Sequence, residues 1–520
     1  MSELVERKNS KNAWMIFFAS LGIGLISLAV LYLINDYSLL YYGDVTSHLI
    51  SAKRFVDSTN PGLEQIGTVW LPLPHVIMLP FSTIESLFSS GLVGTIVNLP
   101  LHALTAVFVY KIIQNHTNRG WIAIVGGMLY ASNPNLIYLG ITAMTEAPFL
   151  LFFVGSAYFL QKWIQKLSDG VNVRYIAYSA IFISMATLCR YEAWVLAPAL
   201  IGITIYFAKN KITQNKKTIF VILVSLISGT GILFWLGWNE YSYGDPLEFA
   251  NAEFYAASSQ AVERPYRDFL YLQPQNVLYI YGAAAFMISG PVLLSISVIG
   301  FYHYIKQKPR DMAFLPYFFL SLPVLFTLLT MFGGIAEMSQ WWFNARFATF
   351  LTPLVIVFAC VALFRLKENI HKKAGVSLLV ASLFVFQIFS PTFSVVTFAD
   401  AESGWIYKQS PYSKQVADYL QENYDDGKIM IMTGSAQAHR IMVSGGVPLV
   451  TYDEMIQVHL DRPSFTEPWK YDKWIIMGLE PDSDSMSAVN YWNKNMEQLN
   501  EHYSLVYENQ FYKVFKAKDT

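Results

Sequence analysis

The residues of this sequence that could do chemistry lie mostly at the ends of long apolar stretches. Asp44 follows the first stretch in YYGDVTSHL, and His48 comes four residues later, on the same face of the helix expected there. A second carboxylate, Glu146, opens a later stretch in TAMTEAPFLLFF. The other candidates occupy similar junctions: Lys53, Arg54, His75, Arg190, Tyr191, Glu192, Asn344 and Arg346.

These residue types suit the transfer of a group from a phosphorylated lipid. A carboxylate can accept the proton of an attacking hydroxyl group, as general bases do. Arginine binds phosphate through two N–H groups and keeps its charge inside a membrane cleft. Because ionisable groups at membrane depth are costly, each one is a functional candidate by default. Carboxylates that could activate an acceptor hydroxyl lie near basic residues that could bind a phosphate. This combination indicates a lipid-linked donor.

Each candidate also has a structural interpretation, which the sequence alone leaves open. Asp44 and Glu146 could cap helices through the amides of the first turn. Arg190 and Glu192 could neutralise each other, and Arg190 or Arg346 could reach lipid headgroups. The histidines could be structural rather than metal ligands. Only the whole group, gathered at one membrane face, favours catalysis.

The elements that must position these residues are membrane spans. Of the 520 residues, 54% are hydrophobic and 14% charged, whereas soluble proteins average about 25% charged residues. A bilayer core about 30 Å thick needs roughly 20 apolar residues per helix. Eleven stretches qualify: 13–34, 92–112, 121–139, 147–165, 175–189, 191–208, 218–238, 283–305, 312–332, 347–364 and 374–391. We therefore expect a polytopic α-helical membrane protein with about 11 transmembrane helices. The fifth and sixth stretches are nearly fused, so an even number stays open.

Lysine and arginine are concentrated in alternate loops, which orients the chain by the positive-inside rule. The N-terminus is expected to be cytoplasmic, and two long loops, 35–91 and 239–282, to be external. The first begins with a segment, 43–58, that reads as an interfacial helix. Its three following prolines argue against a regular span. The chain is thus predicted to be a multi-pass protein of the cell membrane.

The character of the chain changes near residue 399. KIMIMTG, VPLVTY and KWIIMG read as short strands, with helices near 413–423, 438–443 and 486–503 between them and two further strands at the end. We expect residues 1–398 to form the transmembrane catalytic domain. Residues 399–520 are expected to form a small extracytoplasmic α/β domain.

This layout resembles the GT-C superfamily of integral-membrane glycosyltransferases, particularly its protein O-mannosyltransferase and aminoarabinose-transferase group. The matching features are the acids in YYGDVTSHL and TAMTEAPFLLFF. LCRYEAWVLAP, GDPLEF, FNARFATFLTP and DSTNPGLEQIGTVWLPLPH also look like stretches of bacterial and archaeal members. The similarity covers roughly residues 30–355, and the tail matches only in its placement.

The resemblance implies the inverting transfer of a sugar from a polyprenyl-monophosphate donor to an acceptor hydroxyl on the extracytoplasmic face. It makes Asp44 the general base and Glu146 a second acid that assists the acceptor or a bound cation. It assigns donor-phosphate binding to Arg190, Arg346, Lys53, Arg54 and His75. It leaves His48, Tyr191, Glu192 and Asn344 as substrate-binding candidates.

One departure from the family bears on cofactors. Many members carry paired acids in the first loop, whereas here Tyr42 and Gly43 precede a single Asp44. No cofactor is therefore certain. A divalent metal cation stays open, with His48 and Glu146 as further ligand candidates, but arginine alone can stabilise a phosphate leaving group.

Three rival functions are a lipid-linked-sugar transporter or flippase, a polysaccharide ligase, and a membrane-anchored binding protein whose tail does the work. A transporter would need polar groups near mid-membrane and often repeated halves. A net charge of −1 gives no attraction to nucleic acid. The expected partners are the lipid-linked donor, the bilayer and an acceptor that is a protein, lipid or glycan.

Overall fold

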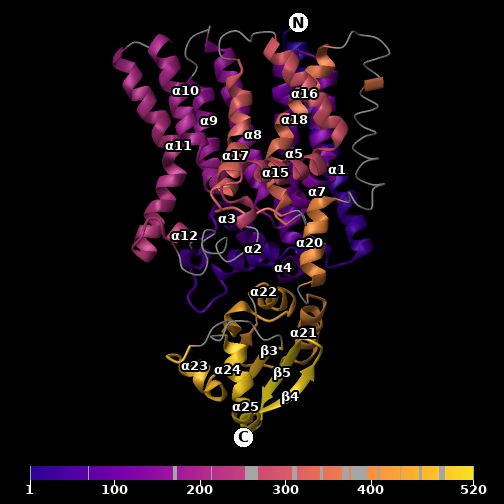
Figure 1. The fold of residues 1–520 in the computed structure, drawn as a ribbon, viewed down its shortest axis with the longest axis vertical. Helices are drawn as coiled ribbons and strands as arrows, with labels where there is room; N and C mark the ends of the chain where they lie inside the picture. The colour runs from indigo at the N-terminus through magenta and orange to yellow at the C-terminus, as the bar shows by residue number, and fades with distance from the viewer. Residues whose placement is uncertain are drawn as a thin grey trace. The chain divides into compact units, whose positions relative to one another are not determined.

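Figure 1 shows a computed structural model of the chain. It describes residues 2–518 except 68, 168–172, 212–213, 252–266, 307–312, 340–342, 366–373, 376–394, 408–409, 434, 456–458 and 480–486. The chain divides into two compact units. The first comprises Met1–Val30, Thr68–Pro74 and Ile96–Asp400, and the second comprises Leu31–Gly67, His75–Thr95 and Ala401–Thr520.

The first unit is built from apolar helices. In chain order they are α1 (Ser2–Ile34), α5 (Leu92–Thr117), α6 (Gly120–Ala131), α7 (Pro134–Ile141), α8 (Glu146–Gln165), α9 (Val173–Thr187), α10 (Leu196–Lys211), α11 (Gln214–Tyr243), α15 (Pro274–Ser289), α16 (Pro291–Lys306), α17 (Leu315–Phe332) and α18 (Thr352–Arg365). Short 3-10 turns η4 (Tyr191–Ala193) and η5 (Ala345–Leu351) precede α10 and α18. Figure 1 shows α9, α10 and α11 side by side, and each pair of them is in contact.

The multi-pass helical class is confirmed, and the count of about 11 spans stays a prediction. Among the described residues, six helices are long and apolar enough to cross a membrane, or up to eight if each of two bent pairs is one span. The stretches expected at 175–189 and 191–208 form shorter apolar helices, Val173–Thr187 and Tyr191–Phe207. Nearly all of the stretch expected at 374–391 lies outside the described residues.

Proline and its neighbours explain the two bent pairs. Between α6 and α7 the axis bends by 59°, where the Asn133 side chain accepts two hydrogen bonds from first-turn N–H groups and Pro134 occupies the first helical position. Between α15 and α16 it bends by 106°, at Gly290 and Pro291. The φ of Gly290 is +80°, which favours glycine. Backbone N–H groups in the first turn of a helix have no hydrogen-bond partner within the helix. Proline suits this position because it has no N–H.

The second unit contains a five-stranded sheet in the order β2-β1-β3-β5-β4. Its strands are β1 (Ile429–Met432), β2 (Tyr452–Glu454), β3 (Trp474–Gly478), β4 (Tyr503–Glu508) and β5 (Tyr512–Ala517). Its helices include α21 (Ser410–Asn423), α22 (Ser435–Ser444), α23 (Pro463–Thr466), α24 (Ala488–Lys494) and α25 (Met496–His502). β1 lies parallel to β2 and β3, and β5 is antiparallel to β3 and β4. IMIM and WIIMG are buried throughout, as expected for strands covered on both faces.

The α/β character expected of the tail is confirmed, with one difference. VPLVTY was expected to be a strand, but Leu449–Thr451 forms a 3-10 turn and the strand begins at Tyr452. The Asp57 carboxylate accepts the backbone N–H groups of Leu449 and Val450 at 2.9 and 3.0 Å. These two donors are therefore not available to a neighbouring strand.

Most of the loop 35–91, which was expected to be external, packs with the tail in this second unit. It forms α2 (Gly43–Arg54), where an interfacial helix was expected, as well as α3 (Leu73–Ser82) and α4 (Glu85–Ser89). α2 packs against α22. Val45, Leu49 and Ala52 of α2 are fully buried. Side chains of the tail therefore cover α2, which is not fully exposed to solvent.

Candidate active site

A buried carboxylate lies between two guanidinium groups in the first unit. Nη1 of Arg190 donates to Oε1 of Glu146 at 2.8 Å, and Nε of Arg346 lies 3.4 Å from the same oxygen. Arg190 also meets both oxygens of Glu192, at 3.2 and 2.9 Å. The Glu146 side chain is fully buried. Two acids and two bases balance one another, as buried charges require.

Three junctions between helices position this cluster. Glu146 is the first residue of α8, whose cap residue Thr145 makes no side-chain capping bond. Arg190 follows α9 on extended backbone with a φ of −152°. Arg346 lies in η5, directly after the left-handed turn residue Asn344, whose φ is +57°. All three residues therefore lie where a helix begins or ends.

The contacts of Glu146 and Arg190 favour an ion pair over a helix cap for Glu146 and over a lipid headgroup contact for Arg190. The Glu146 side chain pairs with arginine, and Oγ1 of Thr145 accepts from Nη1 of Arg190 at 2.9 Å. Burial acts to lower the pKa of Arg190, but the charges of Glu192 and Glu146 outweigh it and raise that pKa. Arg190 is thus held as a cation inside the protein.

Aromatic rings line the same cluster. The Arg190 guanidinium lies 5.0 Å from the ring centre of Phe347 and 5.2 Å from that of Phe350, and Arg346 lies 5.6 Å from Phe347. Cations at such distances from a ring face are attracted to it. Apolar rings beside an ion pair lower the local dielectric constant, which strengthens the pair.

Two of the predicted substrate-binding residues have partners elsewhere in the same unit. Tyr191 donates its hydroxyl to the carbonyl of Val69 at 3.0 Å and accepts from Nε1 of Trp235 at 3.1 Å. Nδ2 of Asn344 donates to the carbonyl of Glu337 at 3.1 Å. These bonds fix the loops around the cluster.

The predicted base, Asp44, lies in the first turn of α2, in the second unit. Arg440 of α22 approaches this turn, because its Nη2 donates to the carbonyl of Tyr41 at 2.9 Å. Burial lowers the pKa of Arg440 to about 10, while the charges of Tyr512 and Asp44 oppose that shift. A guanidinium from the tail therefore acts electrostatically on the carboxylate of the first loop.

A chain of polar contacts joins the middle of α2 to the tail. Oγ of Ser47 lies 2.7 Å from Nδ1 of His439, whose Nε2 lies 3.2 Å from Oε1 of Glu454. Nη2 of Arg54 reaches the same oxygen at 2.9 Å. Burial acts to raise the pKa of Glu454, but His439 and Arg54 outweigh it and lower the pKa to about 2. The ionised Glu454 thus joins both basic side chains.

Lys53, Arg54 and the two histidines, all assigned to phosphate or substrate, make contacts within the second unit. Nζ of Lys53 lies 2.5 Å from Oε2 of Glu85, and Arg54 pairs with Glu454 as described. Nδ1 of His48 lies 2.9 Å from Nε2 of His75. The lysine and the arginine therefore already have carboxylate partners.

Sequence reasoning missed Arg440 and His439. The available signal was the pair HR inside the apolar helix pattern AQAHRIMV, where a buried base needs a partner. Nothing local identified that partner, because Ser47 and His439 are 392 positions apart. Thr145 was missed for a simpler reason, since a Thr before a helix start reads as a cap.

The divalent cation that the sequence leaves open would need several nitrogen or oxygen ligands close together. Among them, no group of three His, Cys, Asp or Glu side chains could hold a metal ion. His48 and His75 direct ring nitrogens at each other, which occupies those two atoms. The described part of the chain therefore does not form a cation site.

Comparisons with known proteins bear on the class of enzyme. Residues 81–235 match the family described as dolichyl-phosphate-mannose-protein mannosyltransferase. This segment includes Glu146, Arg190 and Glu192 but neither Asp44 nor Arg346. A search of curated proteins finds no significant match.

ArnT shares the fold of this chain at low sequence identity, and an archaeal enzyme gives a weaker match. ArnT from Cupriavidus metallidurans, solved with undecaprenyl phosphate, is 12% identical with a TM-score of 0.53, and the alignment covers 94% of this chain and 97% of that one. The oligosaccharyltransferase of Archaeoglobus fulgidus in its apo form is 13% identical with a TM-score of 0.49, over 90% of this chain and 69% of that one. The family match over residues 81–235 and the fold shared with ArnT confirm the predicted resemblance to the GT-C superfamily.

Proposed function

We propose that this chain is a membrane glycosyltransferase that moves a sugar from a polyprenyl-monophosphate donor to an acceptor hydroxyl. The transfer takes place on the extracytoplasmic face and inverts the configuration of the sugar. The observation that carries the proposal is the buried Arg190–Glu146–Arg346 cluster. The ArnT structure with the same fold binds undecaprenyl phosphate, which supports a donor of this chemistry.

In the proposed reaction the acceptor oxygen attacks the anomeric carbon while its proton passes to the Asp44 carboxylate. The bond from that carbon to the phosphate oxygen breaks, and the polyprenyl phosphate leaves with the electron pair. Arg190 and Arg346 stabilise the charge that develops on the leaving phosphate. Attack from the face opposite the phosphate inverts the configuration.

The proposal revises the role of Glu146. Its Oε1 is already shared by two guanidiniums, so Glu146 acts as a positioning residue that holds Arg190 and Arg346. Arg440 has a comparable positioning role toward Asp44. Phosphate binding by Lys53, Arg54 and His75 stays a prediction. So do the roles of the predicted substrate-binding residues.

The experiment that tests the proposal compares donors in liposomes containing the purified protein. Radiolabelled polyprenyl-monophosphate hexoses and nucleotide sugars are offered to the wild type and to Asp44→Asn. Transfer is expected from the lipid-linked donors alone, and the variant is expected to lose about 10²–10⁴-fold in rate, the usual contribution of a general base.

The matched control is Asp36→Asn, which changes an exposed carboxylate eight positions earlier in the same unit. It should leave transfer unchanged. Near-normal turnover by a folded Asp44→Asn protein would remove Asp44 as the base. Movement of intact lipid-linked sugar between leaflets, without cleavage, would favour the flippase instead.

A further inference from the structure

The second unit places a serine, a histidine and a glutamate in line. Oγ of Ser47, in α2, lies 2.7 Å from Nδ1 of His439, in α22. On the other side of the ring, Nε2 of His439 lies 3.2 Å from Oε1 of Glu454, the last residue of β2. Both distances fall within the hydrogen-bond reach that joins a nucleophile to its base and the base to a third, orienting group. The sugar transfer proposed above makes no use of this arrangement.

The carboxylate decides which nitrogen of the imidazole carries the proton. Burial acts to raise the pKa of Glu454, but His439 and Arg54 lower it to about 2, so Glu454 is ionised at neutral pH. A carboxylate attracts an N–H group, so the proton of the neutral ring lies on Nε2. Nδ1 is then left with its lone pair toward Ser47. This is the tautomer that a general base needs beside a serine.

The Ser47 hydroxyl has two acceptors within reach. They are Nδ1 of His439 at 2.7 Å and the carbonyl of Gly43, one turn earlier in α2, at 3.1 Å. A contact of 2.7 Å between a hydroxyl oxygen and an unprotonated ring nitrogen is favourable only with the proton between them, because two lone pairs repel at that distance. The hydroxyl therefore donates to His439, as it must before the proton can be transferred.

The surrounding contacts fix the three groups and limit what can reach them. α2 packs against α22, and Nη2 of Arg54, the last residue of α2, lies 2.9 Å from Oε1 of Glu454. Ser47 is 8% exposed, and the side chains of His439 and Glu454 are 15% and 20% exposed. An opening of this size admits a small acyl group and excludes a long chain.

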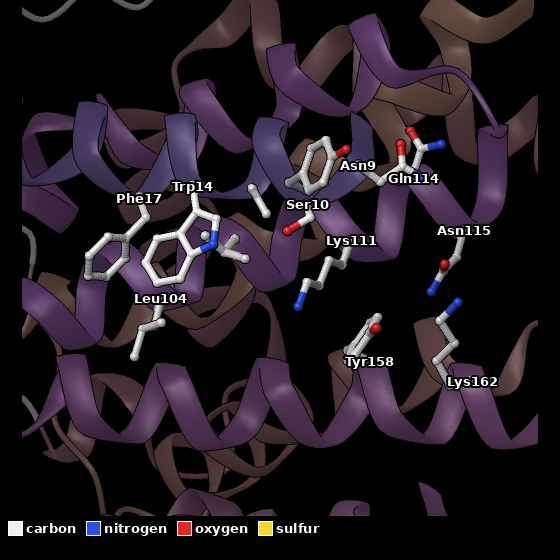
Figure 2. A pocket seen from close by; sticks show the side chains of 13 residues that line it. Asn9, Ser10, Trp14, Phe17, Leu104, Lys111, Gln114, Asn115, Tyr158 and Lys162 are labelled. Atoms are coloured by element: carbon white, nitrogen blue, oxygen red, sulfur yellow. The ribbon is translucent and has the colours of Figure 1, made fainter. Parts of the chain in front are cut away.

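The chain also offers an exposed serine for comparison. Ser10 lines a hollow of about 460 Å³ among α1, α5 and α8 in the first unit, whose side chains are drawn in Figure 2. Among the described residues, that lining contains no histidine and no carboxylate. Ser10 is thus more accessible than Ser47 but lacks the base and the acid in its lining.

We propose that Ser47 and His439, with Glu454 as their positioning residue, hydrolyse carboxylic esters of small acyl groups such as acetyl. Oγ of Ser47 attacks the ester carbonyl carbon while its proton passes to Nδ1 of His439. The bond from that carbon to the alcohol oxygen breaks, and the leaving alcohol takes the proton from His439. Water then attacks the acyl carbon and gives a proton to His439, which returns it to Oγ as the carboxylic acid leaves.

Reaction of the purified full-length protein with a fluorophosphonate tests the nucleophile, and p-nitrophenyl acetate tests the substrate. Mass spectrometry of peptides locates the label, which is expected on Ser47 and not on Ser10. His439→Gln and Glu454→Gln should each slow labelling and ester turnover by about 10²-fold, the low end of the contribution of a general base. Ser47→Ala should abolish both. Ser10→Ala is the control and should change neither.

A second variant keeps the test decisive if one of these proteins unfolds. In Ser47→Cys, the new thiol should react with iodoacetamide about tenfold faster than in Ser47→Cys/His439→Gln, because a neighbouring imidazole favours the thiolate. The native Cys189 and Cys360 are buried. Equal alkylation rates, equal labelling of Ser10, or labelling of Ser47 that does not depend on His439 would overturn the site. Ester turnover that survives Ser47→Ala, or labelling without ester turnover, would overturn the choice of substrate.

Discussion

At the scale of single residues, Glu146 is a buried carboxylate with one oxygen shared by two cations. Its Oε2 has no hydrogen-bond partner among the described residues, while Oε1 serves two guanidiniums. Replacing one partner of a buried ion pair leaves the other charge uncompensated. The free energy of unfolding should therefore be more sensitive to Glu146 than to any exposed acid.

Glu146→Gln is expected to lower the free energy of unfolding by about 3–5 kcal/mol, since two buried guanidiniums lose their shared anion. Thermal unfolding in detergent measures the change. Glu240→Gln, at an exposed position of α11, is the control and should have little effect. Equal unfolding temperatures for the two variants would contradict the role of Glu146 as the holder of both arginines.

Asp472 gives the second unit a stability that depends on pH. It is buried, and neither carboxylate oxygen has a hydrogen-bond partner among the described residues. Burial, together with the nearby charge of Asp453 and against that of Lys428, raises the pKa of Asp472 to about 7. The folded state therefore holds a proton that the unfolded state releases near its ordinary pKa of about 4.

Because the folded pKa is raised, stability is greatest below the unfolded pKa and is lost as the pH rises to about 7, by roughly 1.4 kcal/mol per unit. Asp472→Asn should remove this loss. We expect the variant to unfold at a higher temperature than the wild type at pH 8 and at a similar temperature at pH 4. A constant difference across that range would refute the assignment.

At the scale of elements, α2 connects the proposed base to the tail. Asp57 accepts two backbone N–H groups of the tail after the helix ends, Ser47 contacts His439 in its middle, and Arg440 binds the carbonyl of Tyr41 before it begins. Contacts before, within and after one helix restrict its rotation as well as its position. The first turn, with Asp44, is therefore oriented by residues of the second half of the chain.

Arg440→Gln tests this orientation. Loss of the guanidinium removes the bond to the carbonyl of Tyr41 that holds the start of α2, so kcat should fall because Asp44 is less well oriented. Steady-state kinetics measure this, with donor KM expected to stay within about threefold because Arg440 is not assigned to the phosphate. Arg462→Gln, an exposed arginine of the same domain, is the control. A rise in donor KM as large as the fall in kcat, or an unchanged kcat, would contradict the positioning role.

Helix type and order could be predicted from the sequence, whereas breaks and partners could not. Apolar runs of about 20 residues identified the long helices α5, α8 and α17 because membrane burial demands that length. The bends at Asn133 and Gly290 escaped prediction, since hydropathy counts apolar residues without registering the direction of the axis. The sequence placed Glu146 and Arg190 on the same membrane face but did not pair them. In the fold, Nη1 of Arg190 lies 2.8 Å from Oε1 of Glu146.

At the scale of the whole molecule, the units do not follow the division expected from composition. Residues 1–398 and 399–520 were the expected domains, and that division stays a prediction. In the contacts, however, most of the loop 35–91 groups with the tail. Composition could not reveal this, because a loop's polarity shows that it leaves the bilayer without showing what covers it.

Removing residues 399–520 is expected to abolish transfer and to expose the first external loop. Limited proteolysis should cut the truncated protein within 43–58, where the full chain resists, because buried residues of α2 lose their cover. Adding the tail in trans should restore resistance. A truncated protein that keeps both activity and resistance would show that α2 is held without the tail, and would exclude the tail as the working part.

The contact between Ser47 and His439 also has a consequence for the order of synthesis. The ribosome completes α2 hundreds of residues before it makes α22, and the loop must wait outside the membrane through the insertion of every later span. The proposed base is thus oriented only when nearly the whole polypeptide has emerged. A nascent or prematurely terminated chain would lack an oriented base, so sugar would not be drawn from the donor pool by unfinished molecules.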